Sequence, residues 1–270
     1  MDQLKLLAPA KLNLFLNILG QRDDGYHELQ TLFQFLDYCD ILTFIDAGQD
    51  IYLDCDQLTL PPSENLVYRA AKLLQQAGGY TRGAKISLVK RIPAGAGLGG
   101  ASSDAATALV GLNRIWRTGL DQADLLGLAA RLGADVPVFV AGHSAWAEGI
   151  GDRLQPVELP QKWYLVVFPA CHVSTAEVFT HPDLTRNGTP ITIARFLEQG
   201  AANACEAAVR RLYPPVDEAF RWLSQWGAAR MTGTGSCVFL DLESASDANK
   251  LLTAVPSQWK AFVAEGINIS

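Results

Sequence analysis

Hydrophobic and polar residues alternate in several stretches of the chain, a pattern typical of β-strands. Residues 12–19 and 32–45 are rich in Leu, Ile and Phe with partial alternation, so the fold is expected to open with a sheet. Residues 84–89 alternate again and lead into a glycine-rich segment. Later strands are predicted from apolar runs at 136–141, 163–168, 237–242 and 262–269.

Helical periodicity separates these strands. Between residues 63 and 79, apolar side chains recur at i, i+3 and i+4, with Ser63 as the expected N-cap and Gly78-Gly79 as the end of the helix. A second helix is expected to begin at Asp121 and to end near Gly133. Further helices are predicted at 101–116, 193–197, 204–212, 216–226 and 245–254. Because helices and strands mix without strict alternation and without a repeat, the pattern favours an α+β fold.

The chain is long enough for two domains of ordinary size. It has 270 residues, of which 49% are hydrophobic and 19% are charged. That composition supplies enough apolar side chain for a substantial core. The pattern restarts after Gly149-Ile-Gly-Asp152 with the strand at 163–168. We therefore expect one domain at residues 1–152 and a second at residues 153–270.

Charge and residue spacing argue against several classes of partner. The net charge is −6 and no run of Lys and Arg covers a face, which argues against nucleic acid. No segment has the apolar length of a membrane span, and Lys5 and Lys11 interrupt the apolar start, which we interpret as a buried strand. The histidines and cysteines lack metal-ligand spacing, so no protein-bound metal is indicated. The five scattered cysteines indicate reduced thiols in a cytoplasmic protein.

Four glycines lie within six positions of the segment 93–104, at Gly95, Gly97, Gly99 and Gly100. Glycine allows the backbone to turn tightly and to approach a ligand closely. Ser102 and Ser103 follow at the expected start of the helix 101–116, where free amides carry partial positive charge. The segment therefore predicts a phosphate site in which backbone amides and a few lysines attract the anion locally, because the net charge of the protein would repel it.

Simpler interpretations of this segment fit less well. A tight turn with a capping serine explains one or two glycines, but not four glycines followed by two serines. The pattern Gly95-x-Gly97-x-x-Gly100 matches a dinucleotide-binding fingerprint, with Asp121 about twenty residues further on. However, Lys90, Arg91 and Pro93 separate the strand from the first glycine, and Asp121 opens a helix instead of ending a strand. No Gly-Lys-Ser/Thr ending is present, which excludes a Walker A loop.

Five segments together resemble the GHMP family of small-molecule kinases, in that family's order and over most of the chain. They are Pro9-Ala-Lys-Leu-Asn-Leu-Phe-Leu16, Asp24-Gly-Tyr-His-Glu-Leu29, Pro93-Ala-Gly-Ala-Gly-Leu-Gly-Gly-Ala-Ser-Ser-Asp104, Gly133-Ala-Asp-Val-Pro-Val-Phe139 and Thr232-Gly-Thr-Gly-Ser-Cys-Val-Phe239. They are most similar to the branch that phosphorylates the 2-hydroxyl of a cytidine diphosphate-linked methylerythritol in non-mevalonate isoprenoid synthesis. The resemblance implies the two-domain GHMP kinase fold, with mixed and antiparallel sheets packed against helices. It places the active site in the cleft between the domains.

By this resemblance the glycine-rich segment binds ATP. The implied contacts are Lys90, Pro93, Ala94, Gly95, Ala96, Gly97, Leu98, Gly99, Gly100, Ala101, Ser102 and Ser103. Relatives carry more glycine where Ala94, Ala96 and Ala101 stand, but the alanines remove no functional group. Lys90 could equally be a solvated charge at a strand end. Mg²⁺ would arrive with the nucleotide, with Ser102 or Ser103 as a candidate hydroxyl ligand.

Lys11 and Asp135 are the expected catalytic pair. An ammonium group within an apolar strand is costly unless an anion compensates it, so Lys11 requires a partner. Asp135 lies between a predicted helix end and a predicted strand. From the residues alone, the two could form a purely structural ion pair. By resemblance, Asp135 accepts the proton of the substrate hydroxyl, while Lys11 keeps that carboxylate ionised and orients the nucleophile.

The resemblance also implies a set of substrate contacts. Tyr26 and Phe179 would stack on the cytosine and His27 would hydrogen-bond its edge. Taken alone, Tyr26 would more often be a packing residue and His27 a satisfied surface or core histidine. The other implied contacts are Asn13, Thr175, Gly233, Thr234 and Gly235. Two alternatives stay open: another acceptor such as mevalonate or homoserine, and a nucleotide-binding protein without catalysis. The Gly-Tyr-His segment weighs against the first, and the presence of both Lys11 and Asp135 against the second. No pattern predicts an oligomeric state.

Overall fold

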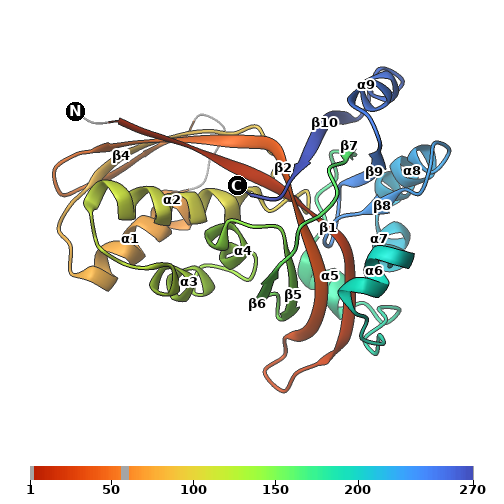
Figure 1. Cartoon of the computed structure of the whole chain (residues 1–270), viewed down its shortest axis with the longest axis horizontal. Helices are drawn as coiled ribbons and strands as arrows, with labels where there is room; N and C mark the ends of the chain where they lie inside the picture. The colour runs from red at the N-terminus through yellow and green to blue at the C-terminus, as the bar shows by residue number, and fades with distance from the viewer. Residues whose placement is uncertain (1–2, 56–60, 270) are drawn as a thin grey trace.

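Two long antiparallel strands, β1 (Gln3–Gln21) and β2 (His27–Asp46), run through the whole molecule (Figure 1). The computed structural model describes residues 3–55 and 61–269. The ladder between β1 and β2 shifts register on either side of the stretch from Lys11 to Asn13. Such irregularities re-aim neighbouring side chains and are common beside functional sites. The expected opening sheet is therefore present, and its irregular part coincides with polar residues of the predicted site.

The remaining strands extend this pair into one mixed sheet. The sheet order is β3-β4-β2-β10-β7-β9-β8, while β1 and β5 also pair with β2, and β6 pairs with β5. Only β3 and β4 pair in parallel among the described strands, which confirms the expected mixed and antiparallel sheet. The strands are β3 (Ile51–Asp54), β4 (Ala84–Val89), β5 (Ala145–Gly149), β6 (Arg153–Pro156), β7 (Trp163–Phe168), β8 (Arg230–Met231), β9 (Val238–Leu242) and β10 (Lys260–Ile267).

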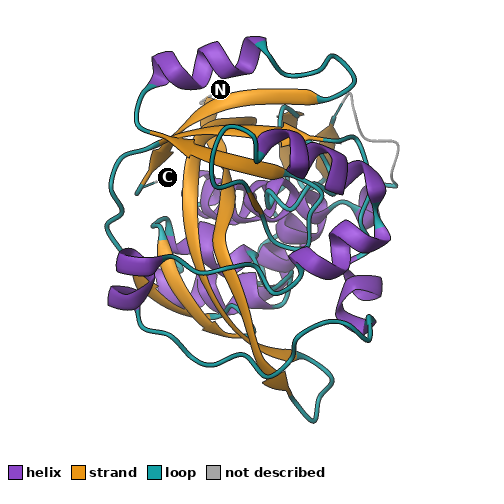
Figure 2. Cartoon of the chain, turned by 90° about the vertical axis from the view of Figure 1, so that its right-hand side faces the viewer, coloured by secondary structure: helices purple, strands orange, loops and turns teal. Residues whose placement is uncertain are grey.

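Helices pack on the sheet in two groups. Figure 1 shows α1 to α4 together on the left and α6 to α9 together on the right, with β1 and β2 reaching both groups. Figure 2 shows helices on several sides of the strands. No described helix is long and apolar enough to cross a membrane. The helices are the 3-10 turn Pro62–Glu64, α1 (Leu66–Gly78), α2 (Gly100–Trp116), α3 (Gln122–Ala130), α4 (Val136–Ala141), α5 (Thr175–Thr180), α6 (Ile193–Gln199), α7 (Glu206–Leu212), α8 (Pro214–Leu223) and α9 (Ala245–Thr253).

The two halves of the molecule share strands. Phe33, Phe35 and Phe44 of β2 pack with α1 to α4 in one hydrophobic core. Leu16 and Ile18 of β1 pack with α7, α8 and the strands β7 to β9 in another. The first strand of the chain therefore supplies side chains to the core of the second half. The division at residues 152 and 153 stays a prediction.

The apolar run 136–141, predicted as a strand, is the helix α4. All residues from Val136 to Val140 are buried, so the run shows no periodicity by which a short buried helix differs from a strand. Pro137 in the first turn and Gly142, in the left-handed conformation at the end, favour the helix. Asp135 consequently lies between two helices and not between a helix and a strand.

Helix ends were predicted with mixed success. Gly79 ends α1 in the left-handed conformation, and Asp121 opens α3 with a capping box, both as expected. The N-cap of α1, however, is Asn65 and not Ser63, because the side chain of Asn65 accepts a hydrogen bond from the Val67 amide at 2.9 Å. Ser63 lies in the preceding 3-10 turn. The strands β3, β5, β6 and β8 and the helix α5 were not predicted.

Candidate active site

The glycine-rich segment forms a loop that leads directly into α2. Gly95, Gly97 and Gly99 have φ of +64°, +77° and +71°, a region that residues with a β-carbon rarely adopt. Gly99 is the N-cap of α2, and no side chain caps that end of the helix. The first amides of α2 are thus open to a ligand, as expected for an anion site.

This loop packs against the turn Thr232–Gly235 from the other end of the chain. A β-carbon at Gly97 would lie 2.4 Å from the carbonyl oxygen of Thr232, so only glycine fits there. The Thr232 hydroxyl donates to the Gly97 carbonyl at 3.1 Å. The Cys237 amide donates to the Ala96 carbonyl at 3.1 Å. Two glycine-rich segments that are far apart in the sequence therefore form one wall of the site.

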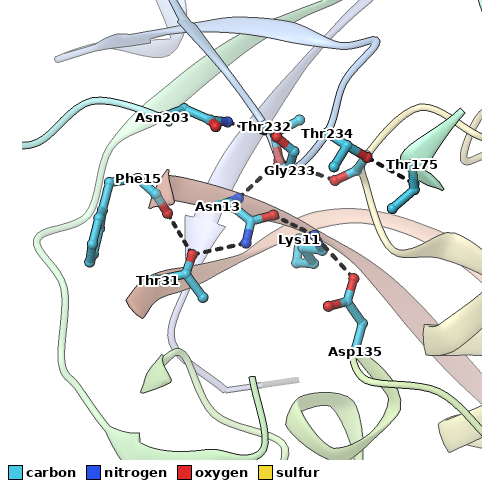
Figure 3. Close-up of polar contacts among 11 residues, drawn as sticks. Lys11, Asn13, Phe15, Thr31, Asp135, Thr175, Asn203, Thr232, Gly233 and Thr234 are labelled. Carbon is cyan, nitrogen blue, oxygen red and sulfur yellow. Dashed lines mark hydrogen bonds and ion pairs between the residues drawn. The ribbon is translucent and has the colours of Figure 1, made fainter. Parts of the chain in front are cut away.

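Lys11 and Asp135 meet beside this loop. The ammonium of Lys11 lies 3.3 Å from a carboxylate oxygen of Asp135, and Figure 3 shows the two side chains pointing at each other. Lys11 is 3% exposed, while Asp135 is 38% exposed and so stays accessible to a ligand. The Lys11 amide also donates to the carbonyl of Leu98 in the loop at 3.0 Å. The predicted pair is thus an ion pair next to the phosphate loop.

A chain of hydrogen bonds fixes the position of Lys11 (Figure 3). Its ammonium donates to the side-chain oxygen of Asn13, whose amide group donates in turn to the Thr31 hydroxyl at 2.9 Å. The Asn13 backbone amide donates to the Thr232 hydroxyl at 2.9 Å. Both oxygen and nitrogen of the Asn13 side chain have partners. The network ties β1, β2 and the glycine turn together around the ammonium group.

The ion pair opens into a cavity of about 550 Å³ between the two halves. The cavity contains most of the predicted site residues: Lys11, Asn13, Gly95, Gly97, Gly99, Ser102, Asp135, Thr175, Phe179, Gly233, Thr234 and Gly235 line it. The hydroxyls of Thr175 and Thr234 hydrogen-bond each other at 3.0 Å across two elements. Sequence reasoning thus identified residues that the fold brings together from five separate segments.

The aromatic residues predicted to bind the cytosine differ in their contacts and exposure. The rings of His27 and Phe179 stack with centroids 4.9 Å apart. The Nε2 atom of His27 is buried and has no hydrogen-bond partner. Burial lowers the pKa of His27, and the nearby Arg186 lowers it further. Tyr26, by contrast, is 59% exposed, and neither Tyr26 nor His27 lines the cavity, whereas Phe179 does.

A second cavity of about 330 Å³ lies on the other side of the phosphate loop. It is lined by Lys90, Pro93, Ala94, Gly95, Ala96, Gly97, Leu98, Gly99, Gly100, Ala101, Ser102 and Asp104, together with Glu64, Asn65 and Leu66. Ser102 lines both cavities, whereas Ser103 is fully buried. The predicted nucleotide contacts other than Ser103 therefore surround one hollow.

Lys90 is a buried ion-pair residue. Its ammonium contacts Asp40 and lies 2.6 Å from Asp104, and all three side chains are buried. The interpretation of Lys90 as a solvated charge at a strand end is therefore wrong. Burial opposes the charge, but Asp104 and Asp40 raise the pKa of Lys90 above its usual value. Burial raises the pKa of Asp104 to about 7, against the attraction of Lys90 and with the support of the Asp40 carboxylate.

Asp40, Asp104 and His172 were not among the predicted site residues. Asp40 and Asp104 hold Lys90, and His172 lines the larger cavity. Asp40 could have been suspected, because a carboxylate within the apolar stretch 32–45 requires a cation. His172 carries no comparable signal, since it lies in a loop between β7 and α5. Among the described residues, no cluster of His, Cys, Asp and Glu is suited to a metal ion.

Comparison with known proteins indicates the same class of protein as the geometry of this cleft does. Residues 65–143 match the GHMP kinases N terminal domain, and residues 182–261 match the GHMP kinases C terminal region. The homoserine kinase from Cytophaga hutchinsonii superimposes with a TM-score of 0.72 over 100% of this chain and 96% of its own, at 17% identity, which shows the fold alone. The fold and the cleft are those of an ATP-dependent small-molecule kinase of the GHMP type.

Closer relatives narrow this class. A protein from Nitrosococcus oceani named 4-diphosphocytidyl-2-C-methyl-D-erythritol kinase is 53% identical over 97% of this chain and 94% of its own length. One of the same name from Methylococcus capsulatus is 52% identical over 99% and 92%. A crystal structure of 4-(cytidine 5'-diphospho)-2C-methyl-D-erythritol kinase matches with a TM-score of 0.82 at 35% identity, covering 97% of this chain and 99% of its own. The chain belongs to the family of 4-diphosphocytidyl-2-C-methyl-D-erythritol kinases.

Proposed function

We propose that the chain transfers the γ-phosphate of ATP to the 2-hydroxyl of 4-diphosphocytidyl-2-C-methyl-D-erythritol, a step of non-mevalonate isoprenoid precursor synthesis. The relatives that carry this name match nearly the whole chain at about half identity, and both family domains are present. The observation that carries the assignment of residues is the Lys11–Asp135 ion pair, which faces the cavity beside the glycine loop.

Asp135 acts as the general base in this proposal. Its carboxylate is partly exposed at the cavity, so it can accept the proton of a hydroxyl that approaches from there. Lys11 orients both the carboxylate and the attacking hydroxyl, because its own position is fixed by Asn13 and by the backbone bond to Leu98. General-base help is worth about 10²–10⁴-fold, whereas correct positioning can contribute roughly 7–11 kcal/mol. The loop and Lys11 therefore matter at least as much as the base.

The loop holds the phosphates of ATP through the open amides at the start of α2. Ser102 is the candidate hydroxyl ligand for Mg²⁺, because it lines both cavities while Ser103 is fully buried. A magnesium ion carried by the nucleotide would supply positive charge to the phosphate oxygens. The low cation content of the described cleft is consistent with a metal that arrives with the nucleotide.

The cytidyl end of the substrate binds near His27 and Phe179. Phe179 lines the cavity and stacks on the imidazole of His27, whose buried Nε2 has no hydrogen-bond partner among the described residues and would bind the edge of a base once this ring contact opens. Tyr26 reaches the same base only if the turn that carries it moves toward the cavity. Thr175, Thr234 and the neighbouring glycines contact the middle of the substrate.

A cytoplasmic location is proposed from the cysteines. Cys39, Cys171, Cys205 and Cys237 are free thiols, as predicted, which fits a reducing compartment. The small-molecule substrate is the only partner that the cleft suggests, and the oligomeric state stays open.

Replacing Asp135 with asparagine is expected to lower kcat by about 10²–10⁴-fold, because the amide cannot accept the proton. Folding and ATP binding should stay unchanged, since Asp135 is partly exposed and makes no side-chain cap of α4. The assay measures ADP formed with Mg²⁺, ATP and each of three acceptors: the cytidyl substrate, mevalonate and homoserine. ADP formation with mevalonate but not with the cytidyl substrate would refute the substrate assignment. Parent-like turnover by a folded Asp135→Asn variant would refute the role of Asp135.

A further inference from the structure

The larger cavity contains little positive charge for the ligands assigned to it. If the proposed function holds, the cavity receives phosphate groups from ATP and from the diphosphate of the substrate. Of its described lining residues, Lys11 is the only lysine or arginine, and Asp135 pairs with it. Lys90 lies in the other cavity and contacts two carboxylates. A further donor that can carry positive charge would therefore have a large effect on phosphate binding.

His172 is the only histidine among the described residues that line this cavity. It is exposed and lies in the loop between β7 and α5. A β-carbon on Gly95 would lie 2.7 Å from Nδ1 of His172 and 3.3 Å from Cε1. The imidazole is thus packed directly against the first glycine of the phosphate loop.

Gly95 has φ of +64° and leaves the space that the imidazole occupies. The contact therefore places a side chain with two ring nitrogens within reach of an anion held by the loop. No hydrogen bond that the structure shows involves the imidazole of His172. Its nitrogens are available to a ligand in the cavity, unlike the amide of Asn13, whose groups already have partners.

We infer that His172 binds a phosphate group held against Gly95, by donating a hydrogen bond from its imidazole to a phosphate oxygen. Such a bond to a charged acceptor is stronger than one between neutral groups, and it strengthens further when the ring carries a proton. The inference rests on the proposed function for the identity of the ligands. The phosphate can belong to ATP or to the cytidine diphosphate group, and the binding experiment separates the two.

The test is titration calorimetry of the full chain with two probes, ATP with Mg²⁺ and CDP. His172→Ala removes the donor, and His172→Gln keeps an N–H donor without the charge. We expect Kd for one probe to rise about tenfold in His172→Ala and less in His172→Gln. The probe that responds identifies the source of the phosphate.

A matched control is His143→Gln, because His143 is exposed, lines neither cavity and is bridged to Ile269 by its backbone. Its affinities for both probes should equal those of the parent. Unchanged affinity of His172→Ala for both probes would overturn the inference. If His172→Ala lowers the thermal stability and weakens the binding of both probes equally, the inference is also overturned. That result would mean that His172 only stabilises the phosphate loop. If the parent forms no ADP with any acceptor, the proposed function fails, but the ATP titration still decides the role of His172.

Discussion

Two buried lysines flank the phosphate loop, and their surroundings differ in a way that separates chemistry from structure. Lys11 has one carboxylate partner, Asp135, which is 38% exposed and faces the cavity. Among the residues that the structure describes, Lys90 contacts two carboxylates, those of Asp40 and Asp104, which are both buried. The first lysine therefore belongs to a charge pair that a ligand can enter, and the second to a closed cluster with an excess of negative charge.

The closed cluster explains how the loop begins. One oxygen of Asp40 accepts hydrogen bonds from the backbone amides of Arg91 and Ile92, at 2.5 Å and 2.8 Å. Lys90 then joins that carboxylate to Asp104 in the first turns of α2. The cluster thus fixes both ends of the phosphate loop, while Lys11 contacts its middle through Leu98. A lysine beside a phosphate loop is not necessarily a phosphate ligand.

Replacing each lysine with methionine tests the difference between them, and these two substitutions should have the largest effects. Lys11→Met should lower kcat by about 10³-fold, because the hydroxyl and the base lose their positioning charge. The free energy of unfolding should fall by only about 1–3 kcal/mol, because the buried side-chain oxygen of Asn13 loses its donor while Asp135 remains partly solvated. Steady-state kinetics and urea denaturation measure the two quantities. A variant that unfolds easily, or one that retains parent-like turnover, would place Lys11 in a structural role.

Lys90→Met should have the opposite outcome. It leaves Asp40 and Asp104 buried without their cation, and breaking a buried pair in this way costs about 3–5 kcal/mol. We expect the midpoint of urea denaturation to fall markedly, while kcat of the fraction that remains folded changes by less than tenfold. Lys90→Met that is as stable as the parent, but has a strongly raised KM for ATP, would instead support the predicted direct contact with the nucleotide.

The surroundings of Lys11 were predicted correctly from the sequence and those of Lys90 were not, for a physical reason. Lys11 lies in a continuous apolar strand, so the cost of its burial was visible and a carboxylate partner could be sought. Lys90 lies at the end of the alternating strand 84–89, where a charged residue is ordinarily solvated. Its two partners come from β2 and α2, and only the folded sheet brings them together. The sequence motifs therefore predicted the chemically active residues. The burial of Lys90 could not be predicted, because it depends on residues that are far away in the sequence.

The same limit applies to secondary structure. The alternating strands and the amphipathic helix at 66–78 were predicted, because each has one face in the core and one in solvent. The run 136–141 was mistaken for a strand, because it is buried on every side. The start of the chain was interpreted as a buried strand, as β1 confirms, whereas β2 was predicted only from residue 32 onward, since its first residues lack the apolar alternation. Tertiary contacts decided these cases.

The smallest expected effect concerns the excess charge of the Lys90 cluster. Asp104 has a pKa raised from 3.8 to about 7, first because it is buried, and one of its oxygens has no hydrogen-bond partner. The folded protein therefore holds this proton at pH values where the unfolded chain has lost it. The contribution to stability is full below about pH 4 and is lost as pH rises toward 7. Lys90 then faces two charged carboxylates in place of one.

Asp104→Asn removes this titrating carboxyl group from the cluster and keeps the size of the side chain. Relative to this variant, the parent should lose about 2 kcal/mol of unfolding free energy between pH 5 and pH 8. Urea denaturation at pH 5, 6, 7 and 8 measures the difference. Asp40→Asn is the matched control: it should be less stable than the parent throughout, because Asp40 also holds the amides of Arg91 and Ile92. Parallel curves for the parent and Asp104→Asn would mean that both carboxylates stay charged, and Lys90 would then balance two anions instead of one.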